Sequence, residues 1–95
     1  MNRPPIVRVA IRFRGVIWSL PAPNRHADVI KVIREAIELT PSIACAEPSD
    51  EDHGFLDADG LFLNRKQALY NAQVNNQLKP GITIRAGRLF SEDVW

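Results

Sequence analysis

Two short stretches of the chain place cationic side chains where helices are expected to begin. The sequence reads NRHADVI at residues 24–30 and NRKQALY at residues 64–70. In each, an Asn suited to the N-cap position precedes a helix-forming stretch whose first turn carries Arg-His or Arg-Lys. The helix dipole disfavours exposed cations at this end by about 0.3–1 kcal/mol each, and a bound anion reverses that sign. Because helix N-termini and guanidinium groups both bind phosphate and carboxylate groups, both starts are candidate anion sites.

The predicted ligand site combines these cations with aromatic rings. Arg25, His26 and Arg65 would hold phosphate groups, and the ring of Phe62 or Trp95 would stack a nucleotide base. The predicted ligand-binding residues are Asn24, Arg25, His26, Phe62, Asn64, Arg65 and Trp95.

Each of these contacts has a structural alternative. The acidic pair at residues 92–93 could fold back onto the helix-start arginines, or those arginines could be solvated. His26 shares a helix face with Ile30 and Ile33, a position typical of a partly buried histidine with a structural hydrogen bond. Trp95 could pack on its own domain or on a partner subunit.

Charge is distributed unevenly along the chain, although the formal net charge is only +1. Residues 1–34 hold seven Lys or Arg against one Asp, and residues 61–95 hold five against two acidic residues. Residues 35–60 hold eight Asp or Glu with no Lys or Arg. Such asymmetry favours an anionic ligand on the basic side, or an acidic segment that folds back onto the basic ones.

The acidic stretch at residues 50–60 does not predict a metal site. A calcium loop that takes Gly60 as its sixth position would begin at Phe55 and end at Lys66, where carboxylates are needed. A nucleophilic pair of Cys45 and His53 lacks any local signature. No glycine-rich phosphate loop, CxxC pair or paired-histidine helix occurs, so we expect no enzyme activity, no metal and no cofactor.

Hydrophobic periodicity predicts one α+β domain over residues 1–95, in the order ββα-ββα-β. Residues 6–13 alternate apolar and basic side chains, as a half-buried strand does, and Gly15 permits a tight turn into the next strand. We expect a small antiparallel sheet with both helices on one face. The expected elements are strands at 6–13 and 16–20, a helix from 24 to about 39, a hairpin at 54–63, a helix from 64 to about 78 and a strand at 82–90.

Composition narrows the class of protein further. The sequence has no apolar run long enough to span a membrane, and prolines and arginines interrupt its N-terminal stretch, unlike a signal peptide. The single Cys45 fits a reducing cytosol. With 95 residues the core is small, so we expect a homo-oligomer associating partly through the C-terminal segment.

Three motifs resemble a family of small, mostly uncharacterised proteins of tailed phages and prophages. The first is an Arg-His-x-Asp helix start, and the last is a Ser-Glu-Asp-aliphatic-Trp ending at residues 91–95. The middle motif comprises Gly54, Phe55, Gly60, Phe62, Arg65 and Ala68. The resemblance implies a phage accessory protein that acts in the host cytoplasm, and it implies no particular activity.

The sequence supports one functional hypothesis and leaves two alternatives open. The first hypothesis is a non-catalytic anti-defence protein that binds and sequesters a phosphate-bearing nucleotide or a similar anionic small ligand. The first alternative is a protein inhibitor that engages a host defence enzyme or nuclease through the acidic residues 47–52. The second alternative is a structural or assembly module of the virion.

Overall fold

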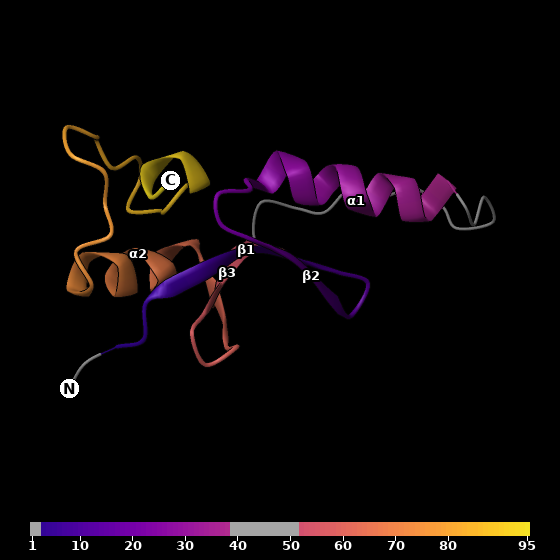
Figure 1. The fold of residues 1–95 in the computed structure, drawn as a ribbon, viewed down its shortest axis with the longest axis horizontal. Helices are drawn as coiled ribbons and strands as arrows, with labels where there is room; N and C mark the ends of the chain where they lie inside the picture. The colour runs from indigo at the N-terminus through magenta and orange to yellow at the C-terminus, as the bar shows by residue number, and fades with distance from the viewer. Residues whose placement is uncertain (1–2, 39–51) are drawn as a thin grey trace.

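The α+β fold expected from the sequence is confirmed by a computed structural model that describes residues 3–38 and 52–95. Four antiparallel strands form one sheet in the order β2-β1-β3-β4, and two helices complete the order ββαββα (Figure 1). The elements are β1 (Ile6–Phe13), β2 (Val16–Pro21), α1 (His26–Glu38), β3 (His53–Asp57), β4 (Phe62–Asn64), α2 (Arg65–Val74) and the 3₁₀ turn η2 (Ser91–Asp93).

Both β-hairpins form where the turn residues predict them. Arg14 and Gly15 have φ values of 53° and 75°, which suit the two central positions of a tight hairpin turn between β1 and β2. In the second hairpin, the Asp57 carboxylate accepts hydrogen bonds from the N–H groups of Asp59 and Leu61, at 2.9 and 3.0 Å. Gly60 has a φ of 83°, as that turn requires. Local sequence therefore fixes the pairing of β1 with β2 and of β3 with β4, whereas the pairing of β1 with β3 joins segments distant in sequence.

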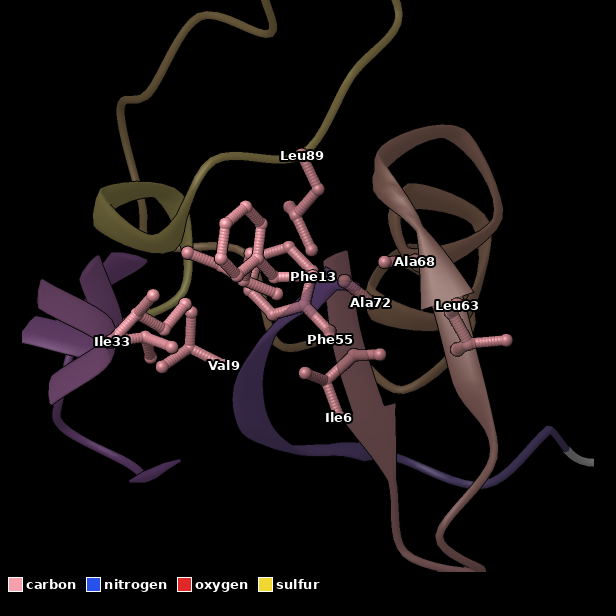
Figure 2. Packing of buried hydrophobic residues seen from close by; sticks show 11 residues of the cluster. Ile6, Val9, Phe13, Ile33, Phe55, Leu63, Ala68, Ala72 and Leu89 are labelled. Carbon is pink, nitrogen blue, oxygen red and sulfur yellow. The ribbon is translucent and has the colours of Figure 1, made fainter. Parts of the chain in front are cut away.

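One face of the sheet packs against both helices and forms the core (Figure 2). Val29 and Ile33 of α1 are buried, and Ile30 packs at the margin of the core. Ala68 and Ala72 of α2 are fully buried, and their small side chains let this helix pack closely on the sheet. The sheet and the C-terminal region contribute Ile6, Val9, Ile11, Phe13, Phe55, Leu63 and Leu89.

Helix α2 ends at Val74, four residues earlier than the sequence predicted. The chain leaves the helix because Asn76 adopts a left-handed φ of 59°, and Gln77 N–H then donates to the Ala72 carbonyl at 2.8 Å. The Gln77 side chain bonds both the N–H and the carbonyl of Ile6, each at 2.8 Å. A glutamine outside the helix thus pairs with the start of β1.

The predicted strand at residues 82–90 is wrong. Its only ladder contact is an isolated bridge between Arg85 and Arg88, which closes a turn in which Ala86 and Gly87 have φ values of 54° and 65°. After this turn, Leu89 N–H donates to the Arg65 carbonyl at 3.0 Å instead of joining the sheet. The chain after this turn is therefore held by Arg65, the first residue of α2, and not by the sheet.

Gly54 is the position in β3 where a larger side chain is excluded. A Cβ atom there would lie 2.2 Å from the Leu63 carbonyl oxygen and 2.6 Å from Cζ of Phe62. We predict that Gly54→Ala lowers the free energy of unfolding by about 1–3 kcal/mol or more, because overpacking forces the backbone of β4 to move. Urea denaturation measures this loss. A change below about 0.5 kcal/mol, the range of ordinary surface substitutions, would show that the strands do not approach so closely.

Candidate anion-binding site

The C-terminal segment, defined here as residues 89–95, lies between the starts of the two helices (Figure 1). The Arg65 guanidinium at the start of α2 donates from Nη1 to the Leu89 carbonyl at 2.9 Å. The hydroxyl oxygen of Ser91 accepts a 3.4 Å hydrogen bond from the N–H of His26, the first residue of α1. The two Asn-Arg motifs therefore meet the same segment from opposite sides.

The start of α1 is closed by contacts within the chain. The predicted Asn24 N-cap is wrong, because helix α1 begins only at His26 and the Asn24 amide donates to the Pro21 carbonyl at 2.9 Å. The indole Nε1–H of Trp95 donates to the Asn24 carbonyl, and Arg25 donates from Nη2 to the main-chain oxygen of Trp95 at 3.0 Å. Trp95 thus packs on its own domain, one of the two placements predicted for it.

His26 is buried and makes the structural hydrogen bond that its position predicted. Its Nε2–H donates to the Gly54 carbonyl at 2.8 Å, and its ring meets the rings of His53 and Phe55 edge-on. Burial, assisted by the positive charge of Arg65, lowers the pKa of His26 from 6.5 to about 3. The imidazole is therefore neutral at physiological pH.

The start of α2 is capped as the sequence predicted. The Asn64 side chain accepts the N–H of Gln67 at 2.8 Å, and the Gln67 side chain accepts the N–H of Asn64 at 3.0 Å. This reciprocal pair is a capping box. It fixes the first turn, so the Arg65 and Lys66 side chains leave the helix from defined positions.

Arg65 is only 8% exposed although it carries a guanidinium group. Besides its bond to Leu89, its Cζ lies 4.4 Å from the centroid of the Phe90 ring, and Arg85 approaches the same ring at 4.2 Å. Arg85 also pairs with Glu92 at 2.7 Å. These contacts give the C-terminal segment cation–π and ionic links to two arginines.

The two carboxylates of the C-terminal segment have partners among the described residues. The hydrogen bond from Arg85 lowers the pKa of Glu92, and the more distant charge of Arg25 acts in the same direction. The Asp93 carboxylate accepts the N–H of Phe90 at 2.9 Å. The C-terminal segment meets Arg65 through the Leu89 carbonyl and the Phe90 ring, and Arg25 through the main-chain oxygen of Trp95. Pairing of the two carboxylates with these arginines stays a prediction.

A basic pocket of about 480 Å³ opens at the start of α2. Four of its described lining residues are cationic, and none of the described lining is acidic. These cations come from β1, from the first turn of α2 and from the turn at residues 85–88. The described lining comprises Arg12, His53, Phe62, Asn64, Arg65, Lys66, Gln67 and Arg88.

The pocket contains part of the predicted site and separates it from the rest. Phe62, Asn64 and Arg65 line it, whereas the start of α1 and Trp95 are not part of its described lining. Arg12 was predicted only as part of a basic strand face, and Arg88 gave no local signal. Only the fold brings these two arginines to the start of α2.

Arg12 links the pocket to the described end of the acidic segment. Its guanidinium lies 3.7 Å from the Asp52 carboxylate and 5.3 Å from the centroid of the Phe62 ring. For Asp52, this pair supports the expectation that the acidic segment folds back onto basic residues. Residues 47–51, the remainder of the proposed protein-binding surface, lie outside the described ranges, as does Cys45.

Membrane-spanning helices and metal-holding clusters are both missing from the described ranges. Neither α1 nor α2 has the length and hydropathy that a membrane span requires. Residues 3–38 and 52–95 contain no group of three or more His, Cys, Asp or Glu arranged to hold a metal ion. The fold and the pocket thus define a small α+β protein with a basic cavity at the start of its second helix.

The chain belongs to the family described as Phage T4 y16D protein, whose model matches residues 5–95. This match confirms the resemblance to a small phage protein family, and the C-terminal tryptophan motif of that resemblance stays a prediction. No curated protein and no solved structure matches the chain. The family therefore supports a phage origin, and any activity has to be argued from the site.

The neutral, buried His26 predicts acid sensitivity. Its folded-state pKa of about 3 lies below the 6.5 of the unfolded chain, so the unfolded chain binds more protons between these pH values. The stabilising contribution is complete above pH 6.5 and is lost as the pH falls towards 3. Between pH 6.5 and 5, we expect the free energy of unfolding to fall by up to about 2 kcal/mol.

Denaturant titrations at several pH values test this prediction with a His26→Gln variant, which keeps an amide donor for the Gly54 carbonyl. Between pH 6.5 and 5, carboxylates contribute little to the pH dependence of the free energy of unfolding. The variant should lose the part of this dependence that His26 contributes. Equal pH dependence in both proteins would show that the imidazole is not held neutral by burial.

Proposed function

We propose that the protein binds a phosphate-bearing anionic ligand, without turnover, in the basic pocket at the start of α2. The observation that carries this proposal is the convergence of four cations from three parts of the chain on one cavity with no carboxylate in its described lining. Arginine is suited to phosphate because its guanidinium donates two parallel hydrogen bonds.

The helix supports the same ligand. Arg65 and Lys66 stand in the first turn of α2, where the dipole disfavours a cation and favours an anion. A bound phosphate group would convert this unfavourable arrangement into a favourable one. The exposed cation of this turn, Lys66, therefore contributes to affinity and reduces the stability of the free protein.

The described lining favours binding over chemistry. It has no Ser, Thr or Cys that could act as a nucleophile, and no Asp or Glu that could hold a catalytic metal. In a phage protein, such a site would remove a phosphate-bearing host nucleotide from solution, for example a defence signal.

Lys66→Glu should separate binding from stability. Lys66 is exposed, so its replacement leaves the core intact, and a carboxylate in the first turn should stabilise the free helix by about 0.3–1 kcal/mol. The same change reverses a charge at the pocket and should weaken binding of inorganic tripolyphosphate at least about tenfold, or ~1.4 kcal/mol. Calorimetric titration and a melting curve measure the two effects.

Lys31→Glu is the matched control, because Lys31 is an exposed lysine of α1 outside the described lining and the net charge changes equally. It should leave the affinity for tripolyphosphate near that of the unmodified protein. Equal weakening by both variants would indicate attraction to overall charge instead of a site. Failure of the unmodified protein to bind tripolyphosphate or any nucleotide at low salt would refute the proposal.

A further inference from the structure

We infer that the pocket recognises a chain of phosphate groups and does not read a nucleotide base. This inference rests on the proposed function and adds the chemical class of the ligand: an oligophosphate, either inorganic or the phosphate tail of a nucleotide.

Phe62 is the largest ring in the described lining, and its surroundings already occupy it. Its tip lies against the backbone at Gly54, so close that a Cβ atom there would be 2.6 Å from Cζ of Phe62. The Arg12 guanidinium lies over the ring, 5.3 Å from its centroid, and is paired with Asp52. A base that stacked on Phe62 would have to displace Arg12 from both contacts.

The other aromatic side chains are also engaged. Trp95 donates its indole N–H to the Asn24 carbonyl, and its ring packs edge-on against Phe55. His53 lines the pocket but meets the ring of His26 edge-on, with centroids 5.3 Å apart. Phe90 has both Arg65 and Arg85 against its ring. The sequence-based prediction that Phe62 or Trp95 stacks a base therefore finds little support in this arrangement.

The cations lie around the cavity and come from different parts of the chain. Arg12 comes from β1, Arg65 and Lys66 from α2, and Arg88 from the turn that follows it. Charges from three elements can contact several phosphate groups of one ligand, whereas a single phosphate reaches only some of them. The affinity should therefore rise with the number of phosphate groups.

Calorimetric titrations with two ligand series at one low salt concentration test this inference. The first series is orthophosphate, pyrophosphate and tripolyphosphate. The second is adenosine with its mono-, di- and triphosphate, extended to the triphosphates of guanosine, cytidine and uridine. Base stacking on an aromatic ring strengthens binding by roughly 5- to 150-fold, which sets the scale for a base contribution.

We expect the affinity to increase along each series, the four nucleoside triphosphates and tripolyphosphate to agree within about fivefold, and adenosine not to bind. A larger preference for one base at equal phosphate number, or binding of adenosine, would overturn this inference and leave the proposed phosphate site intact. Failure of every compound to bind would overturn the proposed function itself.

Phe62→Leu adds a second readout that does not depend on the absolute affinity. If the ring does not stack a base, the ratio of the affinities for adenosine triphosphate and tripolyphosphate should be the same in the variant and in the unmodified protein. A selective loss of affinity for adenosine triphosphate, of about fivefold or more, would show that Phe62 reads the base. An equal loss of affinity for both ligands leaves the ratio of affinities unchanged and supports recognition of the phosphate groups.

Discussion

The buried guanidinium of Arg65 is the interaction on which the rest of this structure depends. A charge so poorly exposed has to be compensated by nearby dipoles, rings or anions. The Leu89 carbonyl and the Phe90 ring supply part of this compensation, and they lie in the segment that packs against the start of α1. One arginine at the start of α2 therefore helps to hold the C-terminal segment, and through it the start of the other helix.

The two Asn-Arg motifs have different surroundings because the C-terminal segment makes different contacts with each of them. At α1, the main-chain oxygen and the indole of Trp95 engage Arg25 and Asn24, and the helix start is closed. At α2, the segment meets only part of the first turn, and the remainder faces the basic pocket. The similarity of the two motifs in sequence is thus local, and tertiary contacts close the start of α1 and leave the start of α2 at the basic pocket.

Local physical chemistry made much of the fold predictable. The alternation of β1, the Arg14-Gly15 turn, and the capping box of Asn64 with Gln67 each depend on residues close in sequence. The incorrect predictions occur where contacts between residues distant in sequence determine the local structure. Residues 82–90 have the composition of a strand, but a tight turn and the bond from Leu89 to Arg65 direct the chain to the helix.

The same distinction applies to the site. Arg65, Asn64 and Phe62 were found from the helix start and the adjacent strand, which are local features. Arg12 and Arg88 line the same pocket from distant parts of the chain, and no spacing rule connects them. Trp95 was predicted either to stack a base or to pack on its own domain or a partner subunit, and its packing against Phe55 depends on the whole fold.

The most direct test of this account is a two-dimensional amide NMR titration of the full chain with inorganic tripolyphosphate at low salt. If the pocket at α2 is the binding site, the largest chemical-shift changes should occur at residues 62–67 and at Arg12 and Arg88. The amides of residues 24–26 and Trp95 should change less, because the start of α1 is closed. Changes centred on residues 24–26, or small changes spread over all basic residues, would contradict the account.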